Sequence, residues 1–115
     1  MEMTVSDFSQ LGKRVTLVGR LDISGAAKID APLKEIADST TNIVVDMSGV
    51  DFIASLGMRS LVIAAKTLAR NARALVLLNP TPLVADALTQ AGLGHLLPMV
   101  RSDEEARAAL SRYAS

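Results

Sequence analysis

Apolar and polar residues alternate in the first part of the chain, and this pattern predicts two β-strands. In Glu2–Phe8, the apolar Met3 and Val5 fall on one side and polar residues on the other. Arg14–Leu21 alternates in the same way. Alternation is typical of strands with one wetter face, and the polar segment 10–13 between the two strands predicts a hairpin connection.

Two later segments are apolar without alternation, Asn42–Met47 and Ala74–Asn79. Such runs are typical of strands covered on both faces, so we expect both strands to be central and parallel. The segment between them, from about Ser55 to Arg70, predicts a helix, which makes a strand–helix–strand unit with a right-handed crossover. Its buried stripe is expected at Leu61, Ala65 and Leu68.

A further helix is predicted after the second strand, where residues 22–24 are typical of a helix start. Apolar residues then recur at helical spacing, at Ala26, Ile29, Leu33 and Ile36. Pro32 lies inside this pattern, and proline kinks or restarts a helix. We therefore expect the firmer part of this helix to follow Asp30, with a looser first turn.

The remaining elements follow from helix and strand boundary signals. Residues 80–82 (Pro-Thr-Pro) start a helix that ends at Gly92 and Gly94. Leu96–Val100 predicts a short strand, confined to the sheet edge by its proline. Residues 102–105 (Ser-Asp-Glu-Glu) form a capping box before the last helix. In the helix that starts at residues 80–82, the buried stripe is expected at Leu83, Ala87, Leu88 and Ala91. In the last helix, it is expected at Ala106, Ala109, Leu110 and Tyr113.

The element order is therefore β-β-α-β-α-β-α-β-α, an α/β domain with a mixed sheet of about five strands and about four helices. The 115 residues suffice for one domain with a real core but not for two. Only two phenylalanines and one tyrosine are present, so that core must be aliphatic and rich in alanine.

Charge and composition narrow the function. Twelve basic and twelve acidic residues give no net charge, which disfavours nucleic acid as the main partner. The absence of cysteine excludes disulfides, thiol catalysis and thiolate metal sites. No signal-peptide pattern and no apolar run of roughly 18 residues occurs, so we expect a cytoplasmic protein without membrane insertion.

Few residues suggest catalysis. Neither common glycine-rich phosphate motif occurs, and no cofactor is predicted. The single histidine, His95, can be combined on paper with Ser55 into a hydrolytic triad, but a nucleophile elbow needs glycine where Ile53 stands. Asp46 and Asp51 could act as a pair of carboxylates in general acid–base catalysis, although such residues more often make hydrogen bonds in turns.

The residue that remains is Ser55, at the junction between a strand and a helix. Serine is a favoured helix N-cap, worth about 1 kcal/mol. Gly57 costs the first turn roughly 1 kcal/mol relative to alanine, which indicates that another backbone or a phosphate comes close. Leu56 and Met58 lie near the exposed helix start and, with Ile23, indicate an apolar contact surface.

Residues 46–61, "DMSGVDFIASLGMRSL", resemble the central motif of the STAS domain (sulfate transporter and anti-sigma-factor antagonist). In that family, a strand of the form Asp-Leu-Ser-x-Val-x-Phe-Ile/Met runs into Asp-Ser-Ser-Gly and a helix. "LVGRLDISGA" (17–26) is similar to the family's Gly-Glu-Leu-Asp stretch, and "VLLNPTPLVADALTQAGL" (76–93) to its fourth strand and third helix. The resemblance covers essentially the whole chain and implies a single STAS domain over 1–115.

The resemblance implies a regulatory protein and not an enzyme: an anti-sigma-factor antagonist. Such a protein binds an anti-sigma factor with serine kinase activity. The kinase ends the complex by phosphorylating the first serine of Asp-Ser-Ser-Gly, here Ser55, and a PP2C-type phosphatase reverses this. Asp22 aligns with a family aspartate near the phosphorylation site. The implied partner-binding residues are Asp22, Ile23, Ser24, Ala54, Leu56, Gly57, Met58 and Arg59.

Two positions depart from the family motif. Ala54 stands where the family usually has aspartate, and Leu56 where it has the second serine. The lost aspartate removes a negative charge beside the Ser55 hydroxyl. An alternative function therefore remains open: a non-phosphorylated STAS accessory or scaffold subunit, such as the partner of a lipid-transport ATPase.

Overall fold

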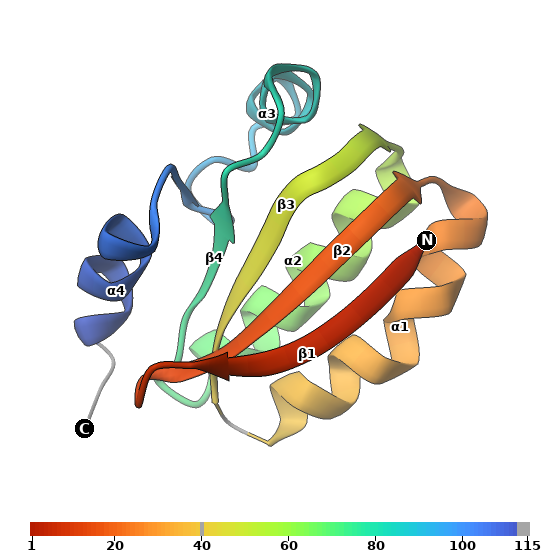
Figure 1. The fold of residues 1–115 in the computed structure, drawn as a ribbon. Helices are drawn as coiled ribbons and strands as arrows, with labels where there is room; N and C mark the ends of the chain where they lie inside the picture. The colour runs from red at the N-terminus through yellow and green to blue at the C-terminus, as the bar shows by residue number, and fades with distance from the viewer. Residues whose placement is uncertain (40, 113–115) are drawn as a thin grey trace.

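The computed structural model describes residues 1–39 and 41–112, which form five strands and four helices in the predicted order. Figure 1 shows their arrangement. The strands are β1 (Glu2–Phe8), β2 (Gly12–Leu21), β3 (Asn42–Ile53), β4 (Leu75–Leu78) and β5 (Met99–Val100). The helices are α1 (Ile23–Asp38), α2 (Ser55–Ala69), α3 (Pro82–Gln90) and α4 (Asp103–Ser111).

The five strands form one mixed sheet in the order β1-β2-β3-β4-β5. β1 and β2 pair antiparallel, and every other neighbouring pair is parallel. The predicted hairpin and the two central apolar strands are therefore confirmed. Each parallel pair is joined by one helix, which returns the chain to the same end of the sheet before the next strand.

The helices divide between the two faces of the sheet. α1 and α2 lie side by side over one face, and α4 packs on the other face near β4 (Figure 1). Alternation along the central strands fills both layers: Ile43 and Val45 belong to the α1–α2 core, whereas Val44 packs with Val76 and Leu110 on the α4 side. α3 contacts β3 at the end where the parallel strands finish. Within the described residues, no helix has the length and apolar character needed to cross a membrane.

β3 runs further than the sequence predicts. The apolar run predicts a strand that ends at Met47, with Asp46 and Asp51 making turn hydrogen bonds, but the strand continues to Ile53 and stays paired with β2. Asp46 does make a turn-like bond, because its Oδ1 accepts the backbone N–H of Ser48 at 3.0 Å. Two shifts in register absorb the irregularity, so the expected turn is a bulged stretch of strand.

α1 is one continuous helix from Ile23 to Asp38, so the prediction of a looser first turn, with the firmer part after Asp30, is wrong. Pro32 is exposed, and its missing N–H removes one helical hydrogen bond. Ile29 and Leu33 on either side are almost fully buried in the core. Burial of this apolar stripe outweighs the defect, and Asp22 fixes the first turn.

The buried stripe of α3 agrees with the prediction only in part. Thr81 is the N-cap and Pro82 the first helical residue, which sets the phase of the turns that follow. Leu88 is buried as predicted. Val84 is buried in place of Leu83, and the predicted Leu83 and Ala91 are exposed.

The last two elements agree in type with the prediction but differ in extent. β5 is an edge strand of two residues, since the chain turns before Pro98 and its pairing with β4 begins at the Pro98 carbonyl, which accepts the Leu77 N–H at 2.8 Å. The Ser102 side chain caps α4 by accepting the Glu105 N–H at 3.1 Å. Ala106 and Leu110 are buried as expected, while Tyr113 lies outside the described residues.

Candidate functional site

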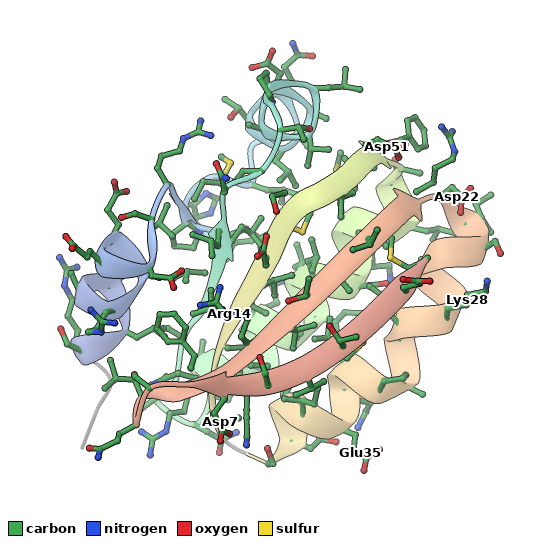
Figure 2. All side chains as sticks on the ribbon, in the orientation of Figure 1. Asp7, Arg14, Asp22, Lys28, Glu35 and Asp51 are labelled. Atoms are coloured by element: carbon green, nitrogen blue, oxygen red, sulfur yellow. The ribbon has the colours of Figure 1, made fainter. Side chains whose placement is uncertain are left out.

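The site is built where β2 and β3 end together. Leu21 and Ile53 are partners in the parallel ladder, so the next residues of both strands emerge at the same edge of the sheet. The N–H of Ala54 donates to the Leu21 carbonyl at 2.9 Å. Neighbouring parallel strands lie about 5 Å apart. The first turns of α1 and α2 are therefore neighbours, and Figure 2 shows Asp22 and Asp51 at this end of the sheet.

The first turn of α1 is closed by its own side chain. Asp22 is the N-cap, and its Oδ1 accepts the Gly25 N–H at 2.8 Å. The Gly25 N–H, helped by the Arg20 guanidinium 3.8 Å from the other carboxylate oxygen, holds the pKa of Asp22 below its ordinary value. The predicted helix start is confirmed, and the Asp22 carboxylate is already engaged within its own helix.

The first turn of α2 is open. Its N-cap is Ala54, which has an extended backbone (φ −102°, ψ 169°) and no side chain that can accept a hydrogen bond. Ser55 is the first helical residue, so the prediction that Ser55 caps this helix is wrong. Capping needs the oxygen on the extended residue before the helix, and Ser55 comes one position too late. The Ser55 side chain is exposed instead.

Gly57 lets α2 begin directly against β2. A Cβ at this position would lie 2.6 Å from the Leu21 Cγ and 2.7 Å from the Leu21 carbonyl oxygen. Of the two explanations that the sequence left open, the close approach of another backbone is confirmed. Gly25 has the same function in α1, where a Cβ would meet the Arg20 carbonyl.

The predicted partner-binding residues differ in how far they are exposed. Ile23 and Leu56 are large apolar side chains left 68% and 42% exposed. Ser24 and Arg59 are exposed as well. Met58 is only partly exposed and packs against the core, so the apolar rim predicted from Ile23, Leu56 and Met58 consists mainly of the first two. That these residues bind a partner stays a prediction.

A contact between Arg20 and Phe52 was not predicted. The Arg20 guanidinium lies 4.3 Å from the centroid of the Phe52 ring, close to the start of α2. These residues are partners across β2 and β3 only because of the bulges in that ladder. No spacing in the sequence signals this pairing, which brings a cation to the edge of the site.

The structure separates the residues of the hypothetical hydrolase. His95 lines a hollow with Lys66 and Ala69 at the C-terminal end of α2. Ser55 begins the same helix, and the rise from Ser55 to Ala69 is about 21 Å at 1.5 Å per residue. His95 therefore cannot act as a base for Ser55.

The two acidic residues considered for acid–base work are also separated. Asp46 and Asp51 lie five residues apart on one strand, or about 16 Å. Asp46 is engaged with Ser48 and lies 3.9 Å from Arg14. Among residues 1–39 and 41–112, no group of three or more metal-ligating side chains comes together.

Known proteins match this chain through its family and its fold. The family model described as "STAS domain" matches residues 10–106. No curated protein sequence matches the chain. A solved anti-sigma factor antagonist from Mycobacterium paratuberculosis is similar in fold, with a TM-score of 0.85 and 19% identity, over 96% of this chain and 93% of that one.

Two forms of one further protein are similar as well. The anti-sigma factor antagonist SpoIIAA in its unphosphorylated form has a TM-score of 0.76 and 21% identity, over 94% of this chain and 96% of that one. The Bacillus cell fate determinant SpoIIAA in the phosphorylated form has a TM-score of 0.71 and 20% identity, over 94% and 99% of the two chains.

Proposed function

Because this chain belongs to the STAS-domain family, we propose that it is a cytoplasmic anti-sigma-factor antagonist regulated by phosphorylation of Ser55. In this proposal residues 1–115 act as one domain and as a binding module without catalysis or a cofactor. The partner is an anti-sigma factor with serine kinase activity, and a PP2C-type phosphatase restores the binding form. The structural similarity to anti-sigma factor antagonists supports the class of partner.

The observation that carries the proposal is the exposed Ser55 hydroxyl at the uncapped start of α2. A phosphate there adds about −1.5 to −2 charges. The free N–H groups of the first turn and the positive end of the helix dipole stabilise such a charge. Because no side chain occupies these donors, the phosphate needs no rearrangement of the domain.

The phosphate would instead change the binding free energy of the partner. Ile23 and Leu56 are exposed beside Ser55, and an apolar contact over them is favourable while the serine is neutral. A dianion at the same place must be desolvated by the partner or face its acidic groups, which costs several kcal/mol. About 3 kcal/mol weakens binding roughly a hundredfold. A local change of charge therefore suffices to release the partner.

Paired variants of Ser55 test the proposal. The serine kinase that co-purifies with this chain from its native cells would be identified, purified and titrated by calorimetry. Ser55→Ala should bind it as tightly as the wild type, and Ser55→Asp should bind at least tenfold more weakly. Ser6→Asp adds the same charge at an exposed serine on β1 and should leave binding unchanged. Equal binding by the two Ser55 variants contradicts the proposal.

A second candidate function rests on Ala54. The residue before Ser55 has no carboxylate, although the family usually has aspartate there, and the kinase loses one recognition feature. In this alternative the chain is a permanent accessory or scaffold subunit, such as the partner of a lipid-transport ATPase. It predicts a stable complex in which Ser55 is never modified and in which Ser55→Asp still binds.

A further inference from the structure

α1 and α2 enclose an open groove on their solvent side, with a volume of about 410 Å³. Alanines from both helices line its floor, among them Ala26, Ala27 and Ala64, and their short side chains leave the space between the helices open. Larger apolar side chains stand along its length, namely Ile23, Leu56 and Ile63. The groove is thus mainly apolar, and small residues give it depth between the helices.

The groove holds an unusual share of the exposed apolar surface. Six large apolar side chains are exposed among the described residues, and three of them, Ile23, Leu56 and Ile63, line this groove. Leu56 and Ile63 lie seven residues apart and so share one face of α2. The groove begins beside Ser55 and extends past Ile63, about 12 Å further along the helix.

The charged side chains that line the groove differ in whether the described residues provide them with a partner. Asp30 accepts a hydrogen bond from the buried Ser60 hydroxyl across the two helices. Lys34 pairs with Asp38 at 2.7 Å. Arg59 is exposed, and no ion pair to it is found among residues 1–39 and 41–112. An occupant of complementary chemistry therefore presents apolar side chains and a carboxylate to Arg59.

We propose that this groove receives an amphipathic helix of the anti-sigma partner, with its apolar stripe on Leu56 and Ile63 and a carboxylate on Arg59. The proposal rests on the proposed function and extends the contact two turns beyond Ser55. A helix fits this groove, because two helices that lie side by side with alanines between them leave a groove into which the side-chain ridge of a third helix can pack. Arg59 sets the orientation of that helix.

The position of Arg59 links the groove to the phosphorylation site. It follows Ser55 by four residues, so both side chains lie on the same face one turn apart. A phosphate on Ser55 is within reach of the Arg59 guanidinium, with the anion on the favourable N-terminal side. Phosphorylation would then draw Arg59 away from the partner carboxylate while adding a charge at the mouth of the groove.

The test uses the full chain and the purified serine kinase that co-purifies with it. Ile63→Glu places a charge in the groove two turns from Ser55, at a side chain 45% exposed in the domain. Val18→Glu is the matched control, since Val18 is 46% exposed but lies on β2, outside the groove. Arg59→Glu reverses the charge expected to meet the partner carboxylate. Circular dichroism and thermal unfolding of all three variants establish that each is folded.

The proposal predicts that Ile63→Glu and Arg59→Glu each weaken kinase binding at least tenfold and that Val18→Glu changes it less than twofold. If the folded Ile63→Glu and Arg59→Glu variants bind the kinase as tightly as the wild type, the groove proposal is wrong. The proposed function still stands in that case if Ser55→Asp releases the kinase. Loss of binding in the groove variants but not in Ser55→Asp supports the groove and contradicts the phosphorylation switch. If no serine kinase binds the wild-type chain, both proposals are wrong.

Discussion

Replacement of Gly57 by alanine tests the closeness of α2 to β2, on which the whole site depends. In an exposed helix, this change stabilises a protein by roughly 1 kcal/mol, since alanine is the better helix former. Here the added Cβ would lie 2.7 Å from the Leu21 carbonyl oxygen, which is also the acceptor for the Ala54 N–H. The obstacle is backbone, which cannot turn away as a flexible side chain does.

The two effects oppose each other, and their magnitudes decide the sign. Overpacking in a well-packed region costs about 1–3 kcal/mol, and a clash with backbone falls in the upper part of that range. After the gain in helix propensity, we expect Gly57→Ala to lower the free energy of unfolding by about 1–2 kcal/mol. For a domain of this size, such a loss lowers the melting temperature by roughly 3–8 °C.

Urea unfolding followed by circular dichroism measures this difference. Gly94→Ala is the control, because a Cβ at Gly94 meets nothing within 4 Å. Its stability should stay within about 0.5 kcal/mol of the wild type. A Gly57→Ala variant as stable as the wild type, or more stable, would refute the reasoning, since α2 would then begin with free space between its first turn and β2.

Two further predictions concern other contacts. Asp22→Ala should lower the urea midpoint at pH 7, whereas Asp22→Asn, which can still cap, should keep most of the stability. Since the folded pKa of Asp22 lies below its ordinary value of 3.8, its contribution is present above that value and disappears as the pH falls through the folded pKa. The stability difference between the wild type and Asp22→Ala should thus shrink in acid toward the smaller contribution of a neutral cap, and a constant difference down to pH 2 would contradict this. Arg14 pairs with Asp103 at 2.8 Å and lies 5.1 Å from the Phe8 ring centroid. Arg14→Met should therefore lower the free energy of unfolding, measured with urea at low salt, by about 1 kcal/mol. Unchanged stability would contradict a stabilising contact between β2 and α4 through Arg14.

The sequence predicts this fold well where local patterns and burial agree. The alternation in β1 and β2 and the apolar runs of β3 and β4 each follow from a single physical requirement, the covering of one or two strand faces. The cap of α4 depends only on residues within one turn and was also found. The looser first turn expected before Asp30 is not found, because the burial of Ile29 and Leu33 outweighs the local effect of Pro32.

The site was predicted less completely because its geometry depends on contacts distant in sequence. Whether Ser55 or Ala54 caps α2 is decided by the hydrogen bond from Ala54 to Leu21, on another strand. The contact of Arg20 with Phe52 depends on the bulged register between β2 and β3. The groove beside Arg59 exists only once α1 and α2 lie together. None of these pairings leaves a periodic signal along the chain.

The most direct test of the central claim is the intact mass of this protein recovered from its native cells, with any modified peptide sequenced. The account predicts one added phosphate on a fraction of the molecules, located on Ser55, with a fraction that changes between growth and stress. A chain that is unmodified under all these conditions, or that carries its phosphate on another residue, would contradict the account. The open first turn of α2 would then serve a permanent assembly.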